Sequence, residues 1–221
     1  MIERVIDKRL STPAFARNTV AWAIKSAAAS PVGSHYVLIT AKVFTAFMFE
    51  GVVDRVVERL CSIWNSPPEK KGRTALSHQS LGERHKTVRD FLGLDNGGSQ
   101  YQEIRLLVGG LLTTRDSFAH PKLCRETVQD RVQSELAAIP EIAWEREIDA
   151  AKIEADFKAL EKYSDSLLDS AAACLESAHA GDWDIARQAY PHLQDLNLEA
   201  AYLRTFLHSP WSSSSDIFPS W

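Results

Sequence analysis

Three segments of this sequence carry apolar side chains at steps of three and four residues, which is the spacing of one face of an α-helix. They cover residues 41–63, 104–118 and 153–175. Each is longer than an ordinary strand, and no segment of the chain alternates apolar and polar residues as a half-buried strand does. The sequence contains no internal repeat either. The helical spacing and the lack of strand-like segments together predict an all-α fold.

Local signals indicate where several of the helices begin and end. A threonine followed by proline opens a helix over about 13–29, which a Pro-Val-Gly stop closes. Ser80 and Glu83 fit a capping box, in which each side chain binds the other residue's backbone N–H, and the glycine at position 93 ends that helix. Ser99 and Gln102 repeat the capping pattern and predict the start of the next helix.

The C-terminal part of the chain is also predicted to be helical. A long helix begins near Asp149 and is expected to end near Gly181, followed by two shorter helices that Pro191 separates. We expect residues 1–208 to form one all-helical domain. Residues 209–221 are rich in serine and tryptophan without periodicity, and they predict a poorly ordered tail unless the tryptophans dock on the body or on a second subunit.

Composition and targeting signals narrow the class of protein. With 45% hydrophobic and 24% charged residues, the chain has the composition of a globular protein. Its three cysteines form no CxxC pair, so we expect reduced thiols and neither a disulfide framework nor a zinc knuckle. No signal peptide is visible, and the apolar run 37–49 is interrupted by Lys42 and is shorter than the roughly 20 residues that span a bilayer. The sequence predicts a cytoplasmic protein without a membrane partner.

The charges are divided unevenly along the chain. The formal net charge of -4 excludes a protein that coats nucleic acid through a uniformly basic surface. Residues 1–140, however, carry 19 Lys and Arg against 14 Asp and Glu, whereas residues 141–221 carry 6 against 15. An anionic substrate is therefore expected to bind the first part of the chain.

One short motif in that part carries chemistry. Arg115 and Asp116 lie near the end of the helix predicted over 104–118, and His120 follows at the break that Pro121 imposes. Imidazole can move a proton near neutral pH and guanidinium can stabilise charge on phosphoryl oxygens, so the pair suits phosphodiester cleavage. Asp116 could hold the imidazole in one tautomer. The alternative is an arginine and a histidine that interact with the last carbonyls of a helix.

These residues resemble the signature of the HEPN superfamily, an arginine and a histidine separated by four to six residues with a polar residue after the arginine. Weaker similarity extends over about 35–180, including the Phe-Glu pair at Phe49 and Glu50 and the Ala-Trp-Glu segment that begins at Ala143. The resemblance implies an up-and-down helical bundle, here with additional C-terminal helices. It also implies a metal-independent ribonuclease that acts as a homodimer, with no cofactor.

Other polar residues have both a functional and an ordinary interpretation. Glu50 and Asp54 could pair with Arg115, although a solvated face or a salt bridge to Arg55 or Arg59 is the simpler prediction. His78 and His85 are expected at the surface, because no metal-ligand spacing surrounds them. Lys122 and the cluster of Lys70, Lys71 and Arg73 are candidate RNA contacts, with a solvated loop as the alternative for the cluster.

Two classes of function follow from the sequence. The first is a HEPN-like ribonuclease, such as a toxin or defence component, in which His120 is the acid or base, Arg115 stabilises the transition state and an antitoxin is a possible protein partner. The second is a non-catalytic HEPN-like module for dimerisation, for RNA or nucleotide binding, or for protein interaction.

Overall fold

The structure is a computed structural model that describes residues 12–30, 34–60, 79–119, 148–189 and 196–208. These residues form six α-helices and no strand, which confirms the all-α prediction. The helices are α1 (Thr12–Ala29), α2 (Ser34–Leu60), α4 (Leu81–Phe91), α5 (Ser99–Ala119), α6 (Ala150–Ala189) and α7 (Leu196–Thr205). The predicted tail 209–221 lies outside the described residues.

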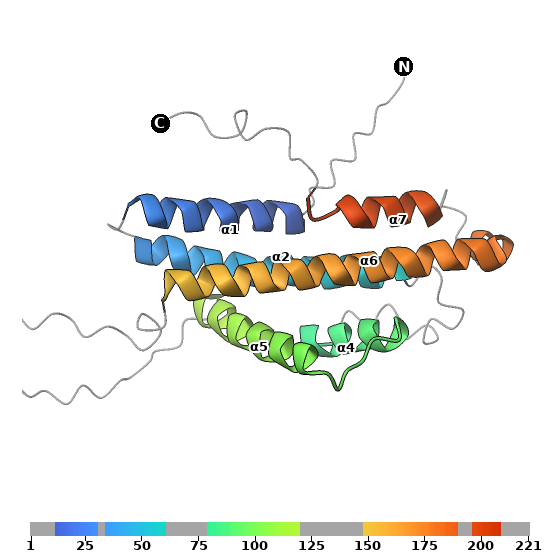
Figure 1. Ribbon diagram of the computed structural model, residues 1–221, viewed down its shortest axis with the longest axis horizontal. Coiled ribbons are helices and arrows are strands. Elements are labelled where there is room, and N and C mark those ends of the chain that lie inside the picture. The colour runs from blue at the N-terminus through green and yellow to red at the C-terminus, as the bar shows by residue number, and fades with distance from the viewer. Residues whose placement is uncertain (1–11, 31–33, 61–78, 120–147, 190–195, 209–221) are drawn as a thin grey trace, which may run out of the picture.

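Helices α2 and α6 lie at the centre of the molecule. Figure 1 shows α1 and α7 end to end along one side of this central pair, and α4 and α5 on the opposite side. Helix α2 contacts α1, α4, α5 and α6, and α7 packs along α6. Buried apolar side chains from all six helices form one cluster. The cluster gives the described helices a shared core, with α2 in its middle.

Helix α2 is 27 residues long, strongly apolar and half buried over its most apolar window. Among the described helices it alone is long and apolar enough to cross a membrane, and half of the relevant window is buried. Its buried residues include Leu38, Met48 and Phe49. Central helices of soluble proteins have the same length and composition, and this burial agrees with the prediction that residues 37–49 belong to a core helix.

The first turn of α1 packs directly on α2. A Cβ atom added to Gly51 would lie 2.5 Å from Cγ of Pro13, which is closer than two carbon atoms can approach without moving. A glycine at this position therefore allows the contact between the two helices, and a larger residue would push the start of α1 away.

The two predicted capping boxes have different outcomes. At α4 the box is present, because the Ser80 N–H donates to Oε2 of Glu83 at 2.8 Å and the Ser80 hydroxyl accepts from the Glu83 N–H. At α5 the helix begins at Ser99 as predicted, but the Gln102 side chain donates to the carbonyl of Asn96 instead of accepting from a cap N–H. The carbonyl of Gly98 receives the first helical bond, from the Gln102 N–H, so the position of the cap is taken by glycine.

Helix α6 begins as the sequence predicts but ends later. Asp149 caps it, with Oδ1 accepting from the N–H groups of Ala151 and Lys152. The predicted end near Gly181 is wrong, because the helix continues to Ala189. A single glycine costs a helix interior only about 1 kcal/mol relative to alanine, and a helix already extended by packing over many turns can continue through it.

Candidate functional site

The structure describes part of the predicted catalytic motif. Arg115 and Asp116 lie in the last two turns of α5, at the end that reaches α2. His120 follows α5 directly and lies outside the described residues, as do the predicted RNA contacts Lys122, Lys70, Lys71 and Arg73.

Arg115 belongs to a chain of ion pairs that links three helices. Its Nη1 donates to Oε2 of Glu50 on α2 at 2.6 Å, and the second oxygen of Glu50 accepts from Nη2 of Arg84 on α4 at 3.1 Å. Nε of Arg84 lies 3.3 Å from Oδ1 of Asp54, one turn further along α2. We call these four residues, Glu50, Asp54, Arg84 and Arg115, the Glu50 network.

The network answers a question that the sequence left open. The simpler prediction of pairs with Arg55 or Arg59 is wrong, because Glu50 pairs with Arg115 and Arg84, and Asp54 pairs with Arg84. The predicted solvated face holds for Asp54, which is 49% exposed, but not for the partly shielded Glu50. Arg55 instead binds Glu58, and Arg59 binds Glu199 on α7. The alternative that paired Glu50 with Arg115 is confirmed.

Asp116 also binds Arg115. Its Oδ1 accepts from Nε at 3.0 Å and from Nη2 at 2.9 Å. The predicted contact, in which Asp116 orients His120, involves a residue outside the described ranges, and the interaction with Arg115 is the one that the structure describes for this carboxylate. A guanidinium carries five N–H donors, so the bonds to Glu50 and Asp116 leave one hydrogen on Nη1 and one on Nη2 for a further acceptor.

The two carboxylates hold Arg115 with different strength. The pair with Glu50 is partly shielded, because the side chains of Arg115 and Glu50 are 23% and 29% exposed. Asp116 is 60% exposed, and exposed ion pairs contribute only about 0–1 kcal/mol. Glu50 is therefore the firmer anchor, whereas an incoming anion could displace Asp116 at little cost.

The charges around the network are not uniform. A groove of about 330 Å³ on the surface of α2 is lined by Phe47, Glu50, Gly51, Asp54, Arg55, Glu58 and Phe206. It contains three carboxylates and one arginine, and because this arginine already pairs with Glu58, the groove lining offers a phosphate no unpaired cation. Burial raises the pKa of the Asp54 carboxyl; Arg84 opposes this change and the charge of Glu50 adds to it. We therefore expect a phosphate to bind Arg115 outside this groove.

A second polar cluster lies inside the core, where the sequence predicted none. His85 on α4 is 2% exposed, and its Nε2 lies 2.7 Å from the hydroxyl of Tyr163 on α6. Nη1 of Arg89 donates to the same hydroxyl at 2.6 Å, so the hydroxyl can donate its own hydrogen to an unprotonated Nε2. Burial, with a smaller effect of the Arg89 charge, lowers the pKa of His85 to about 4.

The prediction that His85 lies at the surface is therefore wrong. The signal that could have found its position is the spacing of Leu81, His85 and Val88, which places the histidine on the apolar face of α4. Arg89, one turn further along α4, and Tyr163, 78 residues away on α6, complete the cluster. Hydrogen bonds to the Tyr163 hydroxyl satisfy the polar side chains of His85 and Arg89 and link α4 to α6.

The described residues contain no candidate metal site. Within the described ranges, no group of three or more His, Cys, Asp and Glu side chains is arranged to hold a metal ion. Cys174 is a free thiol, half-buried in α6, whose pKa is raised by burial. The chemistry that the described geometry supports at the end of α5 is electrostatic binding of an anion by Arg115.

Comparisons with protein-family models, with curated proteins and with solved structures give no match to this chain. The resemblance to the HEPN superfamily therefore depends on the residues of the motif and on the helices that carry them.

Proposed function

We propose that this protein is a HEPN-like, metal-independent ribonuclease whose reaction centre is formed by Arg115 and His120. The observation that carries the proposal is the pair between Glu50 and Arg115. A carboxylate on the central helix fixes the guanidinium of the motif at 2.6 Å, and among the described residues the guanidinium keeps two unused N–H donors. A fixed cation can stabilise charge on phosphoryl oxygens while an imidazole moves a proton, so this pair of residues suits phosphodiester cleavage.

The proposed reaction is attack of a ribose 2′-hydroxyl on the adjacent phosphorus. His120 takes the proton of the hydroxyl and gives it to the leaving 5′-oxygen, and the products are a 2′,3′-cyclic phosphate and a 5′-hydroxyl end. Arg115 stabilises the negative charge that grows on the phosphoryl oxygens in the transition state. No metal or cofactor takes part in this proposal.

Asp116 competes with RNA for Arg115 in this mechanism. In the absence of RNA its Oδ1 occupies the edge of the guanidinium formed by Nε and Nη2. A phosphate can bind the same edge through two parallel hydrogen bonds, which is the preferred geometry of an arginine–phosphate pair. Binding of RNA then displaces an exposed carboxylate, and the Glu50 contact keeps the guanidinium in place.

The remaining parts of the proposal concern partners and location. We assign RNA backbone contacts to Lys122 and to the cluster of Lys70, Lys71 and Arg73. We propose a homodimer, in which two motifs can face one cleft, an antitoxin as a possible second partner, and a cytoplasmic protein that does not act at a membrane. A toxin or defence role fits a ribonuclease of this size.

RNA cleavage by the pure full-length protein in the presence of a chelator tests the proposal. We expect products with 2′,3′-cyclic phosphate ends, and we expect His120→Ala to abolish cleavage while the circular dichroism spectrum stays unchanged. Asp116→Asn should retain cleavage and bind RNA more tightly, because it removes a competing charge. Inactivity of the wild-type protein on RNAs of varied sequence and structure would refute the proposal.

A non-catalytic interaction module is the second candidate, and exposed aromatic side chains favour it. Trp22 on α1 and Tyr36 on α2 are 61% and 75% exposed. Large exposed aromatics of this kind are enriched at protein interfaces. Analytical ultracentrifugation of the wild type and of Trp22→Ala, together with the RNA cleavage assay, would separate the two candidates. The interaction module predicts that Trp22→Ala loses self-association and that the wild type does not cleave RNA.

A further inference from the structure

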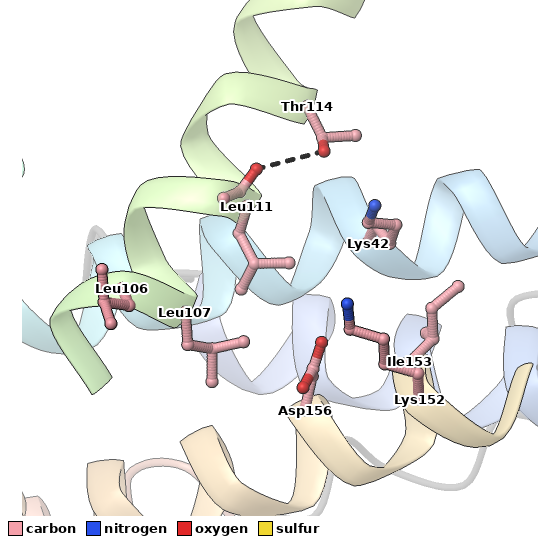
Figure 2. Close-up of a pocket in the computed structure, with 9 residues that line it drawn as sticks. Lys42, Leu106, Leu107, Leu111, Thr114, Lys152, Ile153 and Asp156 are labelled. Atoms are coloured by element: carbon pink, nitrogen blue, oxygen red, sulfur yellow. Dashed lines mark hydrogen bonds between the residues drawn. The ribbon is translucent and has the colours of Figure 1, made fainter. Parts of the chain in front are cut away.

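A pocket between α2, α5 and α6 lies away from the acidic groove and has a different character. Its volume is about 310 Å³, at the lower end of the range of about 300–1,000 Å³ found for small-molecule sites. Figure 2 shows the leucines of α5 on one side of the pocket and the charged side chains of α2 and α6 on the other. The pocket is therefore amphipathic.

The charged side carries two lysines and one aspartate. Lys42 comes from α2, and Lys152 and Asp156 come from the first two turns of α6. The ammonium group of neither lysine forms a salt bridge or hydrogen bond within the part of the chain that the structure describes, and both attract Asp156 at longer range. Burial raises the pKa of Asp156 against this attraction. With all three groups ionised, the lining has one net positive charge, and its ammonium groups have no close acceptor among the described residues.

The apolar side of the pocket has an exposed leucine at its rim and a glycine in its lining. Leu106 is 72% exposed at the rim, and Leu107 and Leu111 line the wall. Gly110 also lines the pocket, and a Cβ atom there would meet nothing within 4 Å. A glycine in a helix interior reduces stability, and here no atom of the described residues requires it. Its effect is to keep the pocket free of a side chain.

We propose that this pocket binds a small amphipathic anion, whose anionic group pairs with Lys42 and Lys152 and whose short aliphatic body lies against the leucines of α5. The charge of the lysines selects an anion, and a carboxylate or a phosphate monoester would satisfy it equally. The leucine wall contains no aromatic ring on which a base could stack, so an aliphatic body fits better than a nucleotide. This binding is independent of RNA cleavage.

Calorimetric titration of the full-length protein tests the proposal, with octanoate and octyl phosphate as probes. Acetate, inorganic phosphate and octylammonium serve as controls that lack the aliphatic chain or reverse the charge. In separate titrations we expect at least one of the two probes, octanoate or octyl phosphate, to bind with one molecule per chain. The probe with the higher affinity identifies the preferred anionic head group. Equal binding of octylammonium, or no binding of either anionic probe at millimolar concentration, would overturn the proposal.

Three variants and a matched control locate the bound probe. Lys42→Met keeps the aliphatic stem but removes the charge, and should weaken binding by about tenfold or more. Asp156→Asn should tighten binding, because it removes the opposing charge. Gly110→Leu should abolish binding by filling the pocket, whereas Gly109→Leu, at an open position outside the pocket lining, should bind as the wild type does.

The control also addresses folding. Both glycine variants place the same side chain in the same helix, so a general effect on α5 would appear in both, and circular dichroism melts would detect it. Unchanged binding in Gly110→Leu or in Lys42→Met would contradict the assignment of this pocket.

Discussion

Acidification is expected to destabilise this fold through His85. The imidazole is 2% exposed, lies edge-on to Phe49 with ring centroids 5.1 Å apart, and pairs with the hydroxyl of Tyr163. Its pKa is about 4 in the folded protein and 6.5 in the unfolded chain. Between these values the unfolded state binds one more proton, so stability is complete above pH 6.5 and falls as the pH is lowered to about 4. Since one pKa unit corresponds to about 1.4 kcal/mol, the loss amounts to about 3 kcal/mol.

Urea denaturation across this pH range measures the effect. The variant His85→Gln can still accept a hydrogen bond from Tyr163 but does not titrate, whereas the carboxylates of the protein are the same in both. The free energy of unfolding of the wild type, relative to that of His85→Gln, should therefore fall by about 3 kcal/mol from pH 6.5 to about 4. A pH-independent difference, or an NMR titration in which His85 protonates near 6.5 in the folded protein, would refute the reasoning.

Further predictions concern stability and can be checked by chemical denaturation. Ser80→Ala should cost about 0.5–2 kcal/mol because it removes the capping box of α4, whereas Ser99→Ala should change stability by less than about 0.5 kcal/mol because Ser99 is not the cap of α5; equal costs would contradict this difference. Gly109→Ala should stabilise the protein by about 0.5–1 kcal/mol, and a loss of stability would show that an unseen contact requires the glycine. Glu50→Gln should cost about 1–3 kcal/mol, since it leaves Arg84 and Arg115 without their shared anion, and a neutral effect would indicate that the Glu50 network does not hold the helices together.

The helices were largely predictable from the sequence, and the errors have local causes. The signals at Ser80 and Asp149 depend on hydrogen bonds within a few residues, and both predicted starts are confirmed. The pattern at Ser99 is the same as at Ser80, but the preceding turn supplies the carbonyl of Gly98 as the first acceptor. Gly181 carries the usual signal of a helix end, and α6 continues past it because one glycine is a weak obstacle to an extended helix.

The candidate site was only partly predictable, because its contacts join distant parts of the chain. The motif at Arg115 and Asp116 is visible in the sequence, and the spacing of Phe47, Glu50 and Asp54 places Glu50 and Asp54 on one face of α2. The partner of Glu50 lies 65 residues away, and the crossing of α5 over α2 selects it. Arg84 joins from a third helix. Helical periodicity gives the face of each residue but not the helix that packs on it.

The most direct measurement compares RNA cleavage by two arginine variants of α5 in the presence of a chelator. Arg115→Ala removes the guanidinium that Glu50 holds, and Arg105→Ala removes an exposed arginine ten residues earlier on the same helix. If Arg115 stabilises the transition state, its loss should lower the cleavage rate by about 10²-fold or more, with Arg105→Ala cleaving as fast as the wild type. Equal rates for the two variants, with both folded by circular dichroism, would contradict a catalytic role of Arg115.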